Sequence, residues 1–279
     1  MHQFGEWMRP IPRNAPTLVF ALVFLMMTVG CRANREKVIE LPNRDRLIRD
    51  QLVFHTDFRL PKRHRLVEQL VQSRNRITKT LKLPQSDEPI NVYLFEDEPS
   101  YRSFMKRHHP YLPRRRAFFV KQDTTLNVFA HWGDRVAEDL QHEVVHGYLH
   151  SVVPQIPLWL DEGLAEYYEV VKGQRGFNRP HILHLAQRFR KGKWKPDLKR
   201  LETLDDPATF TQEDYAEAWL WTHFLLESGE GERRHMICDQ LARLRMKGEA
   251  QPMSDSLAQK VDDANDAIVK HLKFLVEEL

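Results

Sequence analysis

Two histidines and a glutamate at close spacing are the residues of this chain best suited to metal chemistry. The segment His142-Glu143-Val144-Val145-His146 places its histidines four residues apart, and Glu162 follows sixteen residues after the second histidine. On a helix, positions four apart lie on one face, so both imidazoles can reach one ion. Glu143 would lie beside that ion and could take a proton from an attacking water. The spacing therefore predicts a zinc site for hydrolysis, with Glu143 as the general base.

The surrounding residues favour a helix of about 17 residues around this motif. Val136, Leu140 and Val144 recur at helical spacing, Asp134 is the expected N-cap, and Pro154 ends the pattern. Chance alone would produce the five-residue motif in roughly one chain in twenty of this composition, so the helical setting matters. The alternative is a solvated helix whose histidines and glutamate are ordinary surface residues.

A second predicted helix, residues 161–169, can offer a carboxylate as a third ligand if it packs beside the first. Glu162 is the expected ligand and leaves the fourth position for water, as in catalytic zinc sites. Glu166, one turn later on the same face, is the alternative ligand. We expect Glu166 instead to orient a ligand imidazole, or else to be a solvated carboxylate. The zinc pattern that uses a third histidine six residues after His146 is excluded, because that position is Val152.

The motif His142-Glu143-x-x-His146, with Trp159-Leu160-x-Glu162-Gly163-Leu164-Ala165, resembles the gluzincin branch of the zinc metallopeptidases. More narrowly, the chain is similar over about residues 91–227 to a peptidase-MA-like bacterial lipoprotein family described as a domain of unknown function. The resemblance implies an α+β zincin-like domain, a Zn²⁺ cofactor and Glu162 as the third ligand. Asp161 stands where aminopeptidase relatives carry asparagine, and their Gly-x-Met-Glu-Asn segment is missing. The resemblance therefore implies zincin chemistry but does not support an aminopeptidase.

The resemblance also implies a tyrosine that stabilises the tetrahedral oxyanion, and Tyr215 matches it in the segment Tyr215-Ala-x-Ala-Trp219. The alternative for Tyr215 is half-buried packing at the start of a helix, and His223 is a second candidate donor. His150 lies one turn beyond His146 but two turns from His142. We expect His150 not to bind the ion.

Residues 1–31 have the pattern of an export signal. Residues 17–29 are an uncharged apolar run of about 13 residues, too short to span a bilayer, and arginines precede it. Gly30-Cys31 follows and resembles the bacterial lipoprotein processing site, where the cysteine becomes acylated. We expect Cys31 to carry a lipid and residues 32–46 to form a tether on the periplasmic side of the cell envelope. An ordinary signal peptide or an uncleaved anchor is the alternative.

Length and charge bound the remaining possibilities. A chain of 279 residues suits one domain, here residues 47–279, with a strand-rich part (47–133) and a helical part (134–279). The net charge of only +3 argues against nucleic acid as a partner, so a peptide or protein substrate is expected. The basic runs 106–109 and 114–116 are expected to be solvated surface, with an acidic substrate or anionic lipid as alternatives. Cys238 is expected to be a buried thiol.

Periodicity predicts an α+β domain. We expect strands at residues 51–58, 90–95, 117–120 and 126–130, and further helices at 63–83, 99–108, 181–190, 211–227, 232–246 and 262–278. Thr211 and Asp214 predict a capping box. Strand 126–130 is the candidate for binding substrate backbone by strand addition, with an ordinary core strand as the alternative.

The leading hypothesis is an envelope-anchored zinc peptidase, and an endopeptidase is favoured. A non-catalytic zinc-binding lipoprotein that serves as a binding module is the second hypothesis. A zinc amide hydrolase acting on a cell-wall component is the third, and the sequence does not separate it from a peptidase.

Overall fold

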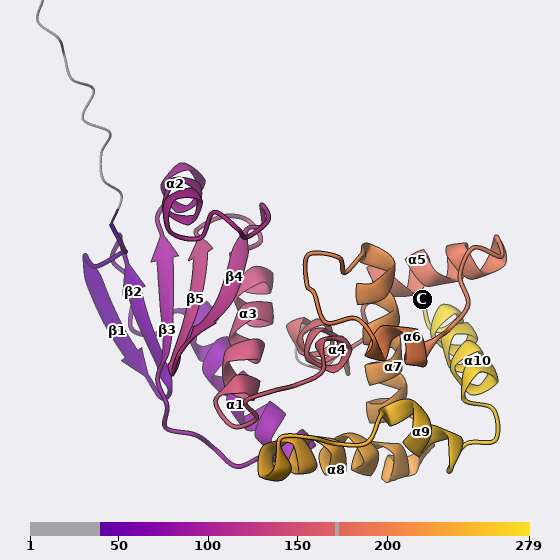
Figure 1. Cartoon of the computed structure of the whole chain (residues 1–279). Helices are drawn as coiled ribbons and strands as arrows, with labels where there is room; N and C mark the ends of the chain where they lie inside the picture. The colour runs from indigo at the N-terminus through magenta and orange to yellow at the C-terminus, as the bar shows by residue number, and fades with distance from the viewer. Residues whose placement is uncertain (1–39, 171–172) are drawn as a thin grey trace, which may run out of the picture. The chain divides into compact units, whose positions relative to one another are not determined.

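A computed structural model describes residues 40–170 and 173–279 (Figure 1). The chain divides into the units Met1–Val38 and Ile39–Leu279, and every element below lies in the second unit. The predicted signal peptide, Cys31 and the tether up to residue 39 lie outside the described residues. Within the described part, no helix has both the length and the apolarity needed to cross a membrane.

In the described residues, five strands form one mixed sheet in the order β1-β2-β3-β5-β4. The strands are β1 (Asp45–Arg49), β2 (Leu52–Thr56), β3 (Ile90–Phe95), β4 (Ala117–Gln122) and β5 (Thr125–His131). β3 runs parallel to β2 and β5, whereas β1 and β4 are antiparallel to their neighbours. β5 therefore lies inside the sheet, and β4 is an edge strand.

Two helices are inserted among the strands, and the remaining helices follow them. Their bounds are α1 (Arg65–Leu81), α2 (Glu98–His108), α3 (Val136–His150), α4 (Leu158–Glu169), α5 (Arg179–Arg190), α6 (Leu198–Glu202), α7 (Gln212–Glu227), α8 (Glu232–Lys247), α9 (Met253–Ala258) and α10 (Ala264–Glu277), with a 3₁₀ turn η1 (Gly229–Gly231). α3 packs on β3, β4 and β5, with α1 beside it (Figure 1). The predicted small mixed sheet and helical C-terminal half are confirmed.

Three details differ from the sequence predictions. β1 starts at Asp45, inside the segment interpreted as a tether. The sequence did not predict this edge strand because only Leu47 is buried in it and most of its other residues are charged. The N-cap of α3 is Arg135 and not Asp134, and no side chain caps this helix end. The short helices α6 and α9 were not predicted, since five or six residues are too few to show a helical period.

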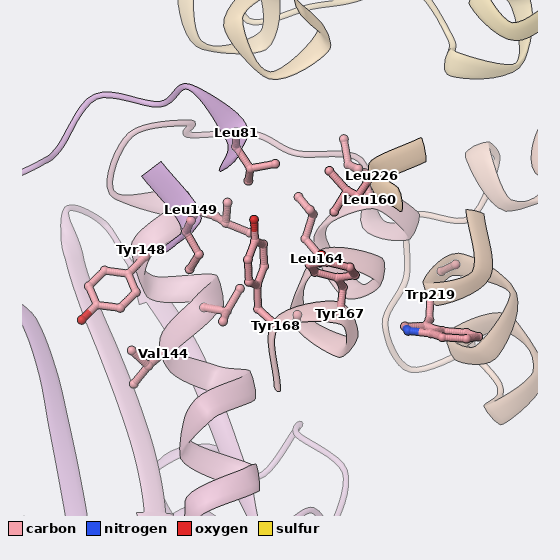
Figure 2. Close-up of a cluster of buried hydrophobic side chains, with 14 of the residues drawn as sticks. Leu81, Val144, Tyr148, Leu149, Leu160, Leu164, Tyr167, Tyr168, Trp219 and Leu226 are labelled. Atoms are coloured by element: carbon pink, nitrogen blue, oxygen red, sulfur yellow. The ribbon is translucent and has the colours of Figure 1, made fainter. Parts of the chain in front are cut away.

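The helix α4 lies between α3 and α7 and connects the sheet to the helical half. Figure 2 shows buried side chains from α1, α3, α4 and α7 that pack together here: Leu81, Val144, Tyr148, Leu149, Leu160, Leu164, Tyr167, Tyr168, Trp219 and Leu226. Gly163 allows the close approach of α4 to α7, because a Cβ at this position would lie 2.5 Å from the carbonyl oxygen of Ala218. The packing of α4 therefore fixes the position of the preceding residue, Glu162.

Candidate metal centre and cleft

The three predicted ligands converge on one point. His142 Nε2 and His146 Nε2 of α3 lie 3.2 Å apart. The Oε2 atom of Glu162 on α4 lies 3.3 Å from the first and 3.6 Å from the second. Tetrahedral zinc with bonds of about 2.0–2.2 Å has ligand atoms about 3.3–3.6 Å apart. His142, His146 and Glu162 are therefore close enough to hold a metal ion, and they outline one face of such a tetrahedron.

The second nitrogen of each ligand imidazole faces a carboxylate. His142 Nδ1 lies 3.0 Å from Glu169 Oε2, and His146 Nδ1 lies 3.0 Å from Asp161 Oδ2. Such partners fix the orientation of the imidazole and increase its basicity as a ligand. Asp161 also lies 2.9 Å from His150 Nε2, so one carboxylate serves two imidazoles.

The contact predicted for Glu166 is made by Glu169 instead. Glu166 is paired with His181 of α5, at 2.8 Å, and Asn178 donates to both Glu166 and Glu169. Positions 162, 166 and 169 share one face of α4, and the carboxylate two turns after Glu162 is the one that reaches His142 Nδ1. The correction is thus a shift of one turn along the predicted face.

Two other sets of side chains could also hold a metal ion in the described residues. One combines His146, His150 and Asp161, and the other combines His142, Glu166 and Glu169. In both, an Nδ1 or carboxylate atom is already paired as described above. The Oε2 atom of Glu162, by contrast, lies 3.3 and 3.6 Å from the two Nε2 atoms, which is the spacing of ligand atoms around one ion and not that of a short hydrogen bond. We therefore favour the set that contains Glu162.

The charges around the ligands favour a cation. Burial alone would raise the pKa of Glu162, but hydrogen bonds with His142 and His146 outweigh it and lower that pKa to about 2. Burial would lower the pKa of His146, but Asp161 and Glu162 raise it to about 10. Burial raises the pKa of Glu169 to about 7, with His142 opposing the rise. A metal that binds here must therefore displace protons from the imidazoles.

Glu143 lies in the same cleft and contacts the edge strand. Its Oε2 atom accepts a hydrogen bond of 2.6 Å from the backbone N–H of Phe119 on β4. The backbone N–H of Phe119 thus faces away from β5, towards α3. Burial raises the pKa of Glu143, which makes its carboxylate a stronger proton acceptor. Strand 126–130, the candidate for strand addition, is β5 and has neighbours on both sides, so its neighbour β4 is the edge strand beside the cleft.

Tyr215 lies close to the ligands although it is distant in sequence. Its hydroxyl lies 3.5 Å from Glu162 Oε1 and accepts a hydrogen bond of 2.7 Å from Arg115 Nη2. Burial and the negative charge of Glu162 raise the pKa of Tyr215 to about 12, so the hydroxyl keeps its proton at neutral pH. The predicted capping box of Thr211 and Asp214 is confirmed and fixes the start of α7, where Tyr215 lies.

The other histidines considered from the sequence have different surroundings. His223 Nδ1 lies 2.9 Å from His271 Nε2, and its ring packs against Trp219. His223 does not line the cleft, so its geometry does not favour a role at the ligands. His150 contacts Asp161 and stacks on Phe119, with ring centroids 5.4 Å apart. Cys238 is buried and free, as predicted.

A cleft of about 480 Å³ lies beside the ligands, and His142 is the one of the three that lines it. Its lining combines basic and acidic side chains: Arg102, Arg114, Arg115, Arg116, Arg135, Glu138, Asp139, His142, Glu143, Glu166, Glu169, Asn178, His181 and Tyr215, with Ala117 and Pro180. The basic run 114–116 is therefore part of the cleft wall and not merely solvated surface. The volume of the cleft is within the range of ligand-binding pockets.

Comparison with known proteins relates part of the chain to a family of unknown function. Residues 136–245, from α3 to α8, match a family model described as "Protein of unknown function (DUF1570)". No curated protein matches the chain. The matched region contains all three candidate ligands, Glu143 and Tyr215.

Three residues at this site were not assigned a role from the sequence. Glu169 had a usable signal, because it shares the helical face of Glu162 and Glu166. Asp161 was noted only as a departure from relatives. Arg115 had no local signal, because its partner Tyr215 lies one hundred residues away.

Proposed function

We propose that this protein is a zinc-dependent peptidase with gluzincin-like chemistry and a zincin-like domain. The observation that carries the proposal is the set of ligand-to-ligand distances of 3.2–3.6 Å among His142, His146 and Glu162. Two imidazoles and one carboxylate form a known ligand set of hydrolytic zinc sites. Glu143 lies next to the first ligand, within the cleft, as a general base should.

Each residue has a distinct role in the proposed reaction. A bound zinc ion supplies positive charge that polarises the scissile carbonyl and lowers the pKa of water to about 7. Glu143 takes a proton from the attacking water and later gives it to the leaving amine. Tyr215, protonated at neutral pH, donates a hydrogen bond to the oxyanion. The edge strand β4 can pair with the substrate backbone, which favours an endopeptidase.

The proposed location is the periplasmic side of the bacterial envelope. It rests on the apolar run 17–29 and on Cys31 as the lipidated residue. Metabolic labelling with a fatty acid tests it, because Cys31→Ser should abolish incorporation of the label. Equal labelling of the two proteins would contradict the lipid anchor.

A peptide-library digest tests the proposed activity. The zinc-loaded protein should cleave a mixed library, and a chelator should stop cleavage. Glu143→Gln should keep zinc and lose at least about 10²-fold in kcat/KM, the usual contribution of a general base. Glu138→Gln is the matched control, because this carboxylate lines the same cleft but pairs with Arg135. Its activity should change less than about threefold.

The outcomes separate the three hypotheses. Undiminished turnover by zinc-loaded Glu143→Gln would refute the role of Glu143. Zinc binding without cleavage of any peptide or cell-wall fragment would favour a binding module. Cleavage of cell-wall amide crosslinks, but not of linear peptides, would favour the amide hydrolase.

A further inference from the structure

The segment between α2 and β4 directs three consecutive arginines to the cleft. Arg114, Arg115 and Arg116 precede β4 directly, and Arg102 and Arg135 also line the cleft. Guanidinium groups stay charged at any physiological pH. The five arginines therefore act as fixed positive charges around the proposed catalytic residues.

Three of these arginines are paired with carboxylates. The pairs are Arg116 with Asp139, Arg135 with Glu138, and Arg102 with Glu98. Arg116 donates from Nε and Nη2 to both carboxylate oxygens, at 2.7–3.1 Å. This two-pronged contact anchors the segment to α3 immediately before β4.

The other two arginines have no carboxylate partner. Arg115 donates to the neutral hydroxyl of Tyr215, and its guanidinium lies over the rings of Tyr215 and Phe118, at 5.4 and 5.9 Å from their centroids. Arg114 is exposed and makes no hydrogen bond or ion pair with residues 40–170 or 173–279. Two positive charges in the cleft therefore lack a direct anionic partner.

We propose that Arg114 and Arg115 bind a carboxylate of the substrate, so that this enzyme prefers peptides with an acidic group close to the scissile bond. The inference rests on the proposed peptidase function. The planar guanidinium matches a carboxylate with two parallel hydrogen bonds, and stacking on two rings orients Arg115 before substrate binds. A single hydroxyl, that of Tyr215, separates Arg115 from the ligand Glu162, so the bound carboxylate would lie near the reacting centre.

Two sources could supply that carboxylate. One is the side chain of an aspartate or glutamate next to the cleaved bond. The other is the C-terminal carboxylate of the peptide itself. Both have the same chemistry, so the test must vary them separately.

Kinetics with matched peptides distinguishes these sources. Peptides identified in the library digest are made with Glu, Gln or Lys beside the cleaved bond and an amidated C-terminus, and with Gln and a free C-terminus. Wild type should prefer one carboxylate-bearing peptide over its neutral analogue by about 10-fold or more in kcat/KM. Arg114→Gln should reduce this preference to about threefold or less. Arg114→Glu should favour the Lys peptide, a reversal that misfolding cannot produce.

Arg243→Gln is the matched control, because Arg243 is an exposed arginine on α8 outside the cleft. It should keep the wild-type preference. Equal rates of wild type on all four peptides would overturn the inference. An undiminished preference for the acidic peptide in Arg114→Glu would also overturn it.

Binding to the inactive Glu143→Gln variant separates this inference from the proposed function. Fluorescein-labelled hexapeptide pools, amidated and containing Glu or Gln, are titrated and followed by anisotropy. The Glu pool should bind about 10-fold more tightly, less so at high salt, and Arg114→Gln in the same background should remove the difference. Binding that depends on Arg114 without any hydrolysis by wild type would refute only the peptidase proposal. Hydrolysis with equal binding of both pools would refute only the acidic preference.

Discussion

Replacing Gly163 with alanine should destabilise the protein and weaken the metal site together. A Cβ at this position would lie 2.5 Å from Ala218 O and 2.9 Å from Ala218 C, and it would also contact Thr222. Backbone atoms cannot rotate away, so α4 and α7 would have to separate by about 0.5–1 Å. Because Glu162 precedes Gly163 on α4, the same movement would pull its carboxylate away from the two imidazoles.

The expected magnitude follows from two opposing effects. Overpacking of a close contact costs about 1–3 kcal/mol, and more when backbone must move. Replacing a helical glycine with alanine stabilises the helix by about 1 kcal/mol. We therefore expect a net loss of up to about 2 kcal/mol in the free energy of unfolding, and a loss of at least about 10-fold in zinc affinity.

Gly147→Ala is the matched control for this experiment. Gly147 also lies inside a helix and directly follows a ligand, His146. The three atoms nearest to its added Cβ would belong to the side chain of Ile90, at 3.0–3.4 Å, which can adjust. Urea unfolding of the metal-free proteins and zinc titration with a competing chelator measure both quantities. If Gly163→Ala were as stable as Gly147→Ala and bound zinc equally well, the proposed contact between α4 and α7 would be refuted.

Two further expectations concern the carboxylate partner of His146 and the buried histidine pair. Asp161→Asn should lower zinc affinity about 10–100-fold, because Asp161 orients His146. His150→Gln removes only the second partner of Asp161 and should change zinc affinity less than about threefold. Equal effects of the two substitutions would contradict the orienting role of Asp161. Burial and nearby positive charge lower the pKa of His223 to about 4, and burial together with His223 lowers that of His271 to about 3. The unfolded chain therefore binds more protons below about pH 6.5, and stability present above that pH is lost as pH falls. His271→Gln should reduce the slope of unfolding free energy against pH, between pH 6 and 5, by about 1 kcal/mol per unit, and an unchanged slope would contradict the pair's burial as neutral groups.

The fold was predictable where the sequence pattern is long and regular. The helix predicted at 63–83 is α1, and the strand predicted at 90–95 is β3 with the same bounds. β1 was missed because an edge strand with one buried residue shows no alternation. α6 and α9 were missed because they are shorter than two helical turns.

The candidate site was predictable only where one helix determines the geometry. His142 and His146 follow from helical spacing, and the face shared by Glu162 and Glu166 also includes Glu169. Which carboxylate on that face reaches an imidazole depends on how α3, α4 and α5 pack, and the sequence carries no local signal for that.

Long-range contacts at the site could not be predicted from the sequence either. The segment around Arg115 meets α7 through Tyr215, a contact set by tertiary packing alone. A basic run of three arginines has the composition of solvated surface, and only the fold reveals that it lines a cleft.

The zinc content of three purified proteins tests the metal site most directly. Wild type and His150→Ala should each contain one zinc per chain, and Glu162→Ala should contain none while unfolding cooperatively. His150 belongs to the competing set with His146 and Asp161, whereas Glu162 belongs only to the favoured set. Wild type without zinc would contradict the proposed centre, and loss of zinc in His150→Ala but not in Glu162→Ala would place the ion in the competing set.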